Sequence, residues 1–399
     1  MHIFHIPSWF PNELKKSSGC FFKAQIEGFA TKFPENRNSI FLWGHSISIV
    51  QIRNLKQLIK TLTWRFKITK KIYSKNGALY LYSPSLIWPN KFGIGGYYKL
   101  KKSLIDSANI AINQNGKIDV IHGHACYPGG YLAALLSDAL NVPYILSEHM
   151  GPFPFPVFMN GGKLNKNIKY ALDKASIITA VSENLKNEIS RFGYKDIKVL
   201  HNPVSHNFCK NLVSTRKKDE KNFNFLCVAS LSEIKKLDIL IKSFSELYKE
   251  NKFVTLQIIG AGPLFVELKG LSNRLNLNKC LKFVGEVNYD EIQQYYLNSN
   301  CFVLVSESET FGLSFCEALL CGKPIISTPV GIAPDLIKRN CGVLVDIGDI
   351  KALTNAMRFI IKNYSDYKPI TLRRNVLSLY GEEIYYKKLS RLYAGLNLN

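Results

Sequence analysis

Two glutamates, Glu309 and Glu317, are separated by seven residues. Of all the residues in this chain, they and their neighbours are the best candidates for binding a ligand or catalysing a reaction. The apolar run 302–305 precedes them and is typical of a buried strand. Glu309 lies in the polar loop that follows, and a helix is predicted to begin near Leu313, with Glu317 in its first turns. Free N–H groups at a helix start bind anions such as a diphosphate, and carboxylates accept hydrogen bonds from sugar hydroxyls. The combination indicates a site for a nucleotide sugar.

The elements that must position these acids follow from the rest of the sequence. Strand-like apolar runs alternate with helical patterns, which predicts an α/β protein with parallel, doubly wound sheets. Ser17-Ser18-Gly19 and Ser182 are expected to cap the helices that follow them. Further expected helices are 22–29, 131–140, 185–189, 237–248, 264–275, 289–297, 353–361 and 384–393. The expected strands are 2–6, 40–43, 79–82, 118–121, 143–146, 177–181, 225–229, 255–259, 281–284, 301–305, 324–327 and 342–345.

Length and composition favour a protein of two domains. The 399 residues exceed what one hydrophobic core usually supports, and a hydrophobic fraction of 46% is ordinary for a soluble protein. We expect no membrane span, because no apolar run reaches the length of a bilayer span, and no signal peptide, because the N-terminus lacks a basic region ahead of an apolar one. The nine cysteines are scattered, and Cys227 and Cys301 lie in apolar strands. They predict buried free thiols and a cytoplasmic location.

The net charge of +22 is distributed unevenly along the chain. Between Glu35 and Asp106 there is no acidic residue, whereas thirteen lysines and arginines occur there. In the segment 53–75 they surround apolar residues at helical spacing, with Trp64 among them. A basic amphipathic segment of this kind favours an anionic membrane surface, here the inner face of the cytoplasmic membrane. A solvated lysine-rich face is the alternative, and no pattern typical of nucleic-acid binding occurs.

The layout and the two glutamates resemble the retaining glycosyltransferases of glycosyltransferase family 4, which have the GT-B fold. Motifs similar to those of the family follow one another along nearly the whole chain. They are 7–11, Ser18-Gly19, 122–124, 147–149, 180–182, 202–204, 228–231 with Lys235, 258–263, 309–312, and Glu317-Ala318. The resemblance implies two Rossmann-like domains: an acceptor-side domain at 1–204 and a donor-binding domain at 205–379. The C-terminal helix, 380–399, is expected to pack back onto the first domain, and the polar stretch 210–224 is the predicted linker.

The resemblance also implies roles for residues of the donor-binding domain. Glu317 would bind the ribose hydroxyls. Glu309 would bind the hydroxyls of the donor sugar and is a candidate catalytic residue. Lys235 would neutralise the diphosphate as it leaves, which suits the negative charge that builds there. The backbone contacts to sugar and phosphate would come from Phe311, Gly312 and Leu313.

Two further roles concern the first domain, and one position departs from the family pattern. Gly19 would let the backbone approach the diphosphate, and His124 would face the donor sugar near the reacting carbon. Ser230 is a candidate donor-binding residue, but many relatives have an arginine there, so one cation is missing. Lys236 and the pair Val330-Gly331 replace frequent glycines, and Asp335 replaces a frequent glutamate.

We therefore expect a retaining, metal-independent enzyme that transfers a sugar from a UDP-sugar to a glycan or lipid-linked acceptor. Surface polysaccharide or lipopolysaccharide biosynthesis is the pathway implied by the resemblance. No cofactor and no metal are expected, because no Asp-x-Asp motif occurs. Two alternatives stay open for the whole protein: a nucleotide-sugar epimerase of the same fold, and a catalytically silent scaffold that docks on membranes.

Alternatives also remain for single motifs. Glu307 and Glu309 could form a metal pair, although a solvated loop acid accounts for Glu307. The histidines of 122–124 could bind zinc together with His149. The motif 260–262 lacks the third glycine of a dinucleotide fingerprint, so it is expected to shape a turn and not to bind NAD.

Overall fold

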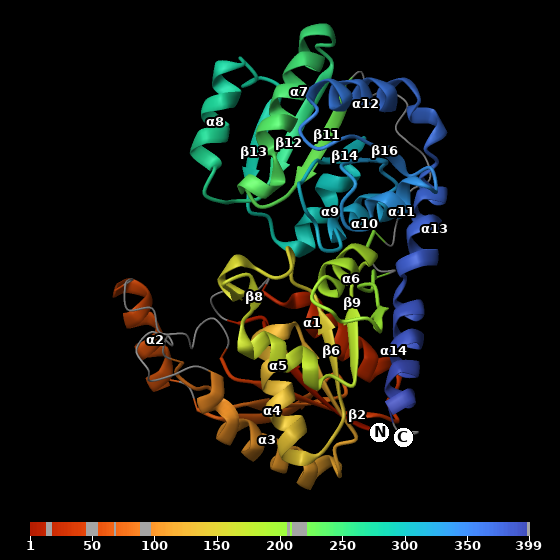
Figure 1. The fold of residues 1–399 in the computed structure, drawn as a ribbon. Helices are drawn as coiled ribbons and strands as arrows, with labels where there is room; N and C mark the ends of the chain where they lie inside the picture. Colours follow the sequence, from red (N-terminus) through yellow and green to blue (C-terminus); the bar gives the residue numbers. More distant parts are fainter. Residues whose placement is uncertain are drawn as a thin grey trace. The chain divides into compact units, whose positions relative to one another are not determined.

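A computed structural model describes residues 1–12, 18–44, 55–67, 69–87, 97–205, 208–209 and 222–396. The chain divides into two compact units (Figure 1). The first unit comprises Met1–Val181, Lys186–Leu200 and Tyr386–Asn399, and the second comprises Ser182–Leu185 and His201–Tyr385. Most of the predicted linker 210–224, and residues 53, 54 and 68 of the basic segment, lie outside the described residues.

The first unit is built on a mostly parallel sheet with the strand order β10-β9-β6-β5-β1-β2-β4-β3. The edge strand β3 runs antiparallel to β4, and the other pairs are parallel. A short hairpin of β7 (Met159–Asn160) and β8 (Lys163–Leu164) stands apart from this sheet. The strands of the large sheet are β1 (His2–Pro7), β2 (Arg37–Leu42), β3 (Lys71–Lys75), β4 (Ala78–Tyr82), β5 (Val120–His124), β6 (Tyr144–Glu148), β9 (Ile177–Ala180) and β10 (Ile197–Val199).

Helices cover both faces of this sheet. Side chains along a strand alternate between its faces, so neighbouring residues of β5 contact helices on opposite sides. Gly123 of β5 faces α4, where a methyl group on it would lie 2.9 Å from Cβ of Ala133. The neighbouring His122 faces α14, where its Nδ1 lies 2.6 Å from the hydroxyl of Tyr393. The helices are α1 (Cys20–Lys32), α2 (Leu55–Lys67), α3 (Leu100–Asn115), α4 (Tyr131–Leu140), α5 (Lys166–Lys174), and the later parts of α6 (Glu183–Ser190) and α14 (Glu382–Leu396).

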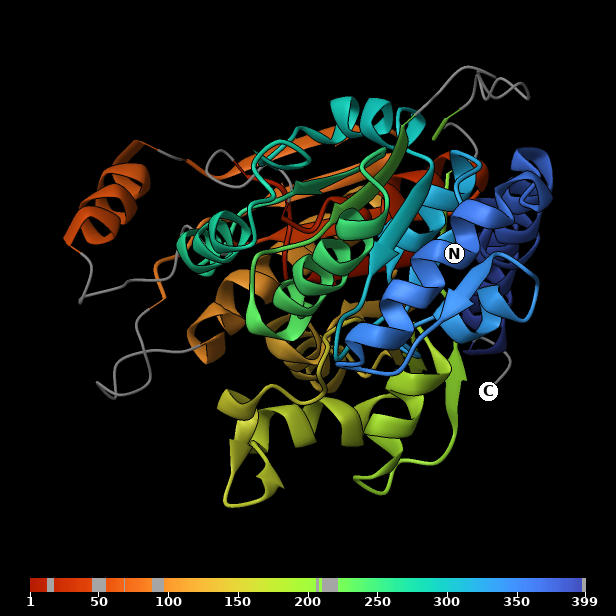
Figure 2. The ribbon, with the colours of Figure 1, turned by 90° about the horizontal axis from the view of Figure 1, so that it is seen from above.

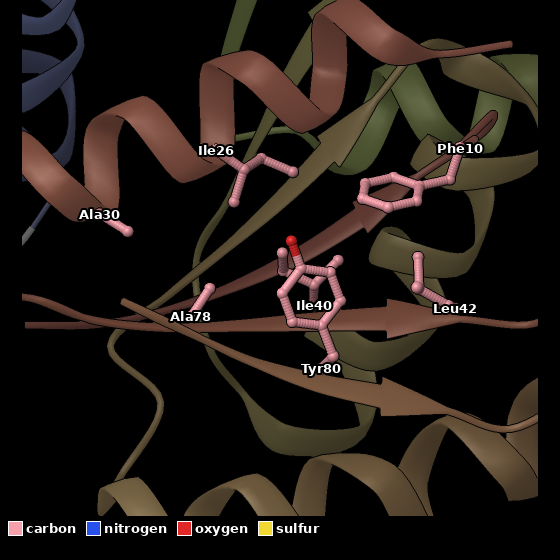
Figure 3. Close-up of a cluster of buried hydrophobic side chains, with 7 residues drawn as sticks. All are labelled: Phe10, Ile26, Ala30, Ile40, Leu42, Ala78 and Tyr80. Carbon is pink, nitrogen blue, oxygen red and sulfur yellow. The ribbon is translucent and has the colours of Figure 1, made fainter. Parts of the chain in front are cut away.

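A cluster of buried apolar side chains joins α1 to β2 and β4 (Figure 3). Ile26 and Ala30 lie four residues apart and therefore share one face of α1. Ile40 with Leu42, and Ala78 with Tyr80, are two residues apart and point to the same face of their strands. The complete cluster is Phe10, Ile26, Ala30, Ile40, Leu42, Ala78 and Tyr80. Through Phe10 this packing anchors the chain just after β1.

The second unit contains a parallel sheet with the strand order β13-β12-β11-β14-β15-β16. Its strands are apolar over most of their length, as strands covered on both faces are. They are β11 (Phe223–Val228), β12 (Val254–Ile259), β13 (Leu281–Gly285), β14 (Cys301–Leu304), β15 (Ile325–Ser327) and β16 (Gly342–Leu344). The helices are α7 (Leu237–Glu250), α8 (Phe265–Arg274), α9 (Tyr289–Leu297), α10 (Leu313–Leu320), α11 (Ala333–Ile337), α12 (Ile350–Lys362) and α13 (Pro369–Tyr380).

These helices form two layers, one on each face of the sheet. Phe225 of β11 pairs in register with Cys301 of β14, so Phe302 points to the opposite face from Phe225. The ring of Phe225 packs against Phe244 of α7, and the ring of Phe302 packs against Phe315 of α10. α7 contacts α8 and α12 in one layer, and α10 contacts α9 and α13 in the other (Figure 2 shows this unit from above).

The strand orders indicate where a doubly wound sheet would bind a ligand in each unit. In the second unit β11 lies between β12 and β14, and in the first unit β1 lies between β5 and β2. Ligands of doubly wound sheets bind outside the carboxyl ends of the strands at such reversals of strand order. The loops after β11 and β14 carry Lys235 and Glu309, and β5 ends at His124, beside the end of β1.

The predicted α/β architecture is confirmed, with several elements that the sequence patterns did not indicate. The edge strand β3 and the helices α3, α5, α11 and α13 were not predicted. The start of α1 also differs from the expected serine cap. Its N-cap is Gly19 in the left-handed conformation, without a capping side-chain hydrogen bond. In the described ranges we find no helix with the length and hydropathy of a membrane span.

Candidate active site

Lys235 and Glu309 form an ion pair at the reversal of strand order in the second unit. The ammonium of Lys235 donates to Oε1 of Glu309 at 2.6 Å, and Oγ of Ser306 donates to the same oxygen at 2.7 Å. A backbone hydrogen bond of 2.8 Å from Glu307 to Ile234 joins the two loops. The side chains of Lys235 and Glu309 are 17% and 13% exposed, so solvent or a ligand reaches both. The fold thus brings a cation and a carboxylate, far apart in sequence, to one place.

Glu317 is held by a tyrosine that the sequence analysis did not identify. The buried hydroxyl of Tyr296, on α9, donates to Oε2 of Glu317 on α10 at 2.8 Å. Glu317 itself is half-buried, and burial raises the pKa of its carboxyl above the ordinary value of 4.5. Burial and the nearby carboxylate also raise the pKa of Tyr296. No local sequence signal indicates Tyr296, because its role depends on the packing of α9 against α10.

The start of α10 requires glycine. Gly312 is the N-cap with φ of 90°, and a methyl group on it would lie 2.4 Å from the ring of Phe315. The side chain of Phe311 is turned into the unit, where it is 3% exposed and its ring packs against Tyr380. Phe311 therefore offers only its backbone to a ligand, whereas Leu313 is partly exposed. The first N–H groups of an α-helix such as α10 have no acceptor one turn earlier within the helix.

Neighbouring loops hold this segment in place. The hydroxyl of Ser182 donates to the carbonyl of Thr310 at 2.6 Å and accepts from the N–H of Leu185, as the predicted cap requires. Gly331 has φ of 54°, and a methyl group on it would lie 2.3 Å from the carbonyl oxygen of Phe311. The glycine of the Val330-Gly331 pair is therefore required by close packing against the loop after β14.

The glycines of 260–262 have a packing role as well. A methyl group on Gly260 would lie 1.9 Å from the carbonyl oxygen of Ala229, and one on Gly262 would lie 2.4 Å from that of Leu231. Both glycines let the loop after β12 approach the loop after β11. This agrees with the expectation that the motif shapes a turn.

The departures from the family pattern can be located. Ser230 is exposed, and its hydroxyl lies 3.1 Å from that of Ser232. Lys236 adopts the left-handed conformation, with φ of 47°, which explains why glycine is frequent there. Its ammonium pairs with Glu307 at 2.7 Å. Because Glu307 pairs with Lys236 and Glu309 pairs with Lys235, each acid of the suspected metal pair already has a cation beside it.

In the first unit His124 belongs to a buried group of histidines. Nε2 of His124 lies 3.3 Å from Nδ1 of His5, and Nε2 of His5 lies 3.1 Å from Oδ1 of Asn38. Both nitrogens of His122 have partners, the hydroxyl of Tyr393 at 2.6 Å and Oγ of Ser147 at 2.8 Å. Burial lowers the pKa of His5 to about 4 and the pKa values of His122 and His124 well below 6.5.

The predicted zinc set of 122–124 with His149 differs from what the structure brings together. Within the described ranges, the three potential metal ligands whose atoms lie within 4.8 Å of one another are His5, His122 and His124. The ring of His149 is 6.3 Å from that of His124 between centroids. His5 lies next to them because β1 pairs with β5 in register, which no local pattern reveals. A metal would have to displace the hydrogen bonds of His122.

The loops around His124 are tightly bonded to one another. Gly19 has φ of 67°, and a methyl group on it would lie 2.5 Å from the carbonyl oxygen of Trp9, so the position requires glycine. Ser8 donates its N–H to the carbonyl of His124 at 3.1 Å and accepts the N–H of Gly129 at 2.7 Å. The carboxylate of Glu148, which the sequence analysis did not single out, is fully buried and accepts backbone N–H groups. These donors are Cys126, His149 and Met150, at 2.6 to 2.7 Å.

Known families match both parts of the chain. The model described as Glycosyltransferase Family 4 matches residues 82–208, and that described as Glycosyl transferases group 1 matches residues 210–375. N-acetyl-alpha-D-glucosaminyl L-malate synthase of Bacillus anthracis is 24% identical over 282 residues, which cover 69% of this chain and 72% of that protein. The putative teichuronic acid biosynthesis glycosyltransferase TuaC of Bacillus subtilis is 26% identical over 247 residues, which cover 60% of each protein.

A solved structure is similar over the full length. The crystal structure of Anabaena HepE in complex with UDP matches with a TM-score of 0.67 and 17% identity, and the match covers 99% of this chain and all of that one. At this identity the match speaks for the fold, two doubly wound domains of the GT-B type. The two family matches show that the chain belongs to glycosyltransferase family 4 and is a glycosyltransferase, of the hexosyltransferase type, that uses a nucleotide sugar.

Proposed function

We propose that the protein is a retaining glycosyltransferase that transfers a sugar from UDP to a hydroxyl of a glycan or lipid-linked acceptor. The observation that carries the proposal is the arrangement in the second unit: the Lys235–Glu309 pair and Glu317 lie on the loops and helix that meet at one reversal of strand order. UDP is proposed because HepE binds UDP. An acceptor in surface polysaccharide or lipopolysaccharide assembly is proposed because TuaC is named for teichuronic acid biosynthesis.

The charges divide the work of binding and bond cleavage. The carboxylate of Glu317, which Tyr296 holds from one side, accepts hydrogen bonds from the ribose hydroxyls. Lys235 and the N–H groups at the start of α10 stabilise the negative charge that builds on the diphosphate when the glycosidic bond breaks. Glu309 accepts hydrogen bonds from hydroxyls of the donor sugar. In the free protein its pairing with Lys235 and Ser306 fixes the orientation of the carboxylate before the sugar arrives.

The first unit contributes groups of another kind. We propose that His124 faces the donor sugar and that Gly19 lets the backbone approach the diphosphate. The absence of a side chain at Gly19 is needed for the loop itself, because Trp9 lies so close. Acceptor specificity is assigned to the loops of this unit.

A thermal-shift screen of the full-length protein against UDP-, GDP- and ADP-sugars tests the donor. We expect a rise in melting temperature with UDP-sugars, because a ligand that binds the folded state stabilises it. The same screen with Glu317→Ala should show no rise. A rise with GDP- or ADP-sugars alone would contradict the proposed nucleotide.

Incubation with a UDP-sugar and no acceptor addresses the epimerase alternative, since an epimerised donor would overturn the transferase assignment. Normal complementation of a knockout by Glu317→Ala would favour the silent scaffold.

Membrane association through α2 is part of the proposal. Ile59 is 54% exposed, Lys60 and Lys70 are exposed, and α2 stands out from the side of the first unit (Figures 1 and 2). An exposed apolar side chain among cations suits an anionic lipid surface. Trp64 was expected to be part of the membrane-binding segment. Its side chain is only 8% exposed, so we assign it to packing within the unit.

Charge reversal tests this membrane surface. Changing Lys56, Lys60, Lys67 and Lys70 to glutamate should abolish sedimentation with vesicles that contain anionic lipids, while UDP binding survives. The matched control reverses four lysines of the second unit, Lys252, Lys269, Lys279 and Lys282, all of them exposed. Equal loss of vesicle binding in both variants would reduce the effect to net charge. Unchanged binding in the α2 variant would remove the segment from the account.

A further inference from the structure

The carboxylate of Glu309 is held at one oxygen by two donors that differ in mobility. Its Oε1 accepts from Nζ of Lys235 at 2.6 Å and from Oγ of Ser306 at 2.7 Å. Ser306 is fully buried, and its carbonyl accepts a hydrogen bond of 2.6 Å from the hydroxyl of Thr328, which is equally buried. The serine is thereby fixed, whereas Lys235 carries its ammonium on a long, flexible stem. Lys235 is therefore the donor that can turn to another partner.

The ammonium of Lys235 is also the group proposed to bind the diphosphate, so Glu309 and the diphosphate compete for it. A phosphate oxygen at ordinary hydrogen-bond length from Nζ lies within about 5.5 Å of Oε1 of Glu309, because Nζ is 2.6 Å from that oxygen. The phosphate and the carboxylate are both negative and repel each other. The side chains of Lys235 and Glu309 are mostly buried, so water and salt screen this repulsion less than they do at an open surface.

UDP and a UDP-sugar meet this carboxylate differently. The terminal phosphate of UDP is free, and its second pKa near 6 gives it roughly one more negative charge at pH 7 than the bridging phosphate of the donor has. UDP also lacks the sugar, whose hydroxyls donate hydrogen bonds to a carboxylate. Both hydrogen bonds that Glu309 makes to described residues go to Oε1, which leaves Oε2 for such a hydroxyl.

We propose that Glu309 is a specificity-determining residue that competes with the diphosphate for Lys235 and thereby weakens binding of the UDP product relative to the UDP-sugar donor. This rests on the proposed function, in which Lys235 binds the diphosphate and Glu309 binds the donor sugar. With the sugar in place, its hydroxyls compensate the carboxylate, and Lys235 is released to the diphosphate. After transfer Glu309 regains Lys235, and UDP leaves. Product release limits the rate of many enzymes, so a residue that promotes it favours turnover.

Titration calorimetry of the full-length protein with UDP and with UMP tests the competition without knowledge of the acceptor. Glu309→Gln removes the charge of the carboxylate and keeps its size. We expect this variant to bind UDP about three- to tenfold more tightly than wild type does, because the repulsion at Lys235 is relieved. It should bind UMP as wild type does, because UMP lacks the terminal phosphate. Unchanged or weaker binding of UDP, or an equal gain for UMP, would overturn the proposal.

Two further variants separate competition for the lysine from a general effect of charge. Glu307→Gln removes an acid of the same loop that pairs with Lys236 at 2.7 Å, and its affinity for UDP should stay within about twofold of wild type. In the background of Lys235→Ala, Glu309→Gln should gain less than it gains beside the intact lysine. An equal gain in that background would reduce Glu309 to plain repulsion and overturn the competition. If Glu309→Gln fails to bind UMP, Glu309→Ala takes its place with the same expected results.

The UDP-sugar with the largest effect in the thermal-shift screen completes the comparison. Wild type should prefer this donor over UDP more strongly than Glu309→Gln does, since the variant gains affinity for UDP and loses a charged acceptor for the sugar. An unchanged ratio of the two affinities would overturn the inference while the enzyme assignment stands. Failure of wild type to bind UDP or any UDP-sugar would instead overturn the proposed donor, and the inference with it.

Discussion

The two reversals of strand order in this protein carry opposite chemistry. In the first unit the candidate groups are neutral, fully buried imidazoles whose pKa values burial has lowered. In the second they are ionised side chains, the Lys235–Glu309 pair and Glu317, left partly exposed. Burying an unpaired charge is costly, so charges are kept where a ligand or water can reach them. The comparison teaches that one fold can bury neutral polar groups at one reversal of strand order and leave charged groups partly exposed at the other.

The largest expected effect comes from removing the carboxylate of Glu317. Glu317→Ala should weaken UDP binding at least about 100-fold, because hydrogen bonds to a charged group contribute roughly 1.5–3 kcal/mol each and two ribose hydroxyls lose their acceptor. Isothermal titration calorimetry with UDP measures this. Glu307→Ala is the matched control, an acid of the neighbouring loop that pairs with Lys236, and it should bind UDP as wild type does. Equal affinity in both variants would remove Glu317 from the nucleotide site.

Lys235→Ala sharpens the contrast between charged and neutral groups. It should lower UDP affinity by about tenfold to 100-fold, since a charge-assisted contact to the diphosphate is lost, and it should leave the affinity for uridine unchanged. Lys236→Ala, one residue along, should change neither by more than about twofold. The two affinities are measured by the same titrations. If Lys235→Ala weakened uridine as strongly as UDP, the lysine would act through the fold and not on the phosphate.

Tyr296→Phe should have a smaller effect on the same carboxylate. It removes the hydroxyl that donates to Glu317 at 2.8 Å and leaves the ring in place. We expect UDP affinity to fall about fivefold, which corresponds to roughly 1 kcal/mol for one buried hydrogen bond. The double variant with Glu317→Ala should be no worse than Glu317→Ala alone. Additive losses in titrations of the two single variants and the double variant would show that the tyrosine acts elsewhere.

Replacing Glu317 by a neutral residue should weaken UDP binding but stabilise the folded protein at neutral pH. Burial raises the pKa of this carboxyl in the folded protein, so the folded state holds the proton more tightly than the unfolded chain does. Between the unfolded value near 4.5 and the raised folded value, stability therefore falls as pH rises, and the loss is complete above the folded pKa. Glu317→Gln should raise the melting temperature at pH 7.5 and show little difference at pH 4. A lower melting temperature at pH 7.5 would contradict the assigned shift.

Much of the second unit could be predicted from the sequence because its signals are local. The helix α9 was predicted with the bounds found, as was α4 of the first unit, and Glu309 and Glu317 fall in the loop and helix expected for them. Cys227 and Cys301 are buried free thiols, as their apolar strands indicated. These features depend on apolar periodicity and helix punctuation within a few residues.

The features that were missed depend on tertiary contacts. Every residue of β3 is exposed, and the strand exists because β4 pairs with it. Tyr296, His5 and Glu148 gain their roles from contacts between different elements, with partners 21, 119 and 22 residues away in the sequence. The helix α5 is an exception, because Asn165 caps it with a side-chain hydrogen bond and the residue type alone could have indicated its start.

A crystal structure of the protein with UDP tests the central claim most directly, namely that the charged groups of the second unit recognise the nucleotide diphosphate. We predict ribose oxygens within about 2.6–3.2 Å of the carboxylate of Glu317 and diphosphate oxygens at the ammonium of Lys235 and the N–H groups of Gly312 and Leu313. UDP bound elsewhere, with the Lys235–Glu309 pair intact and Glu317 facing solvent, would contradict the account.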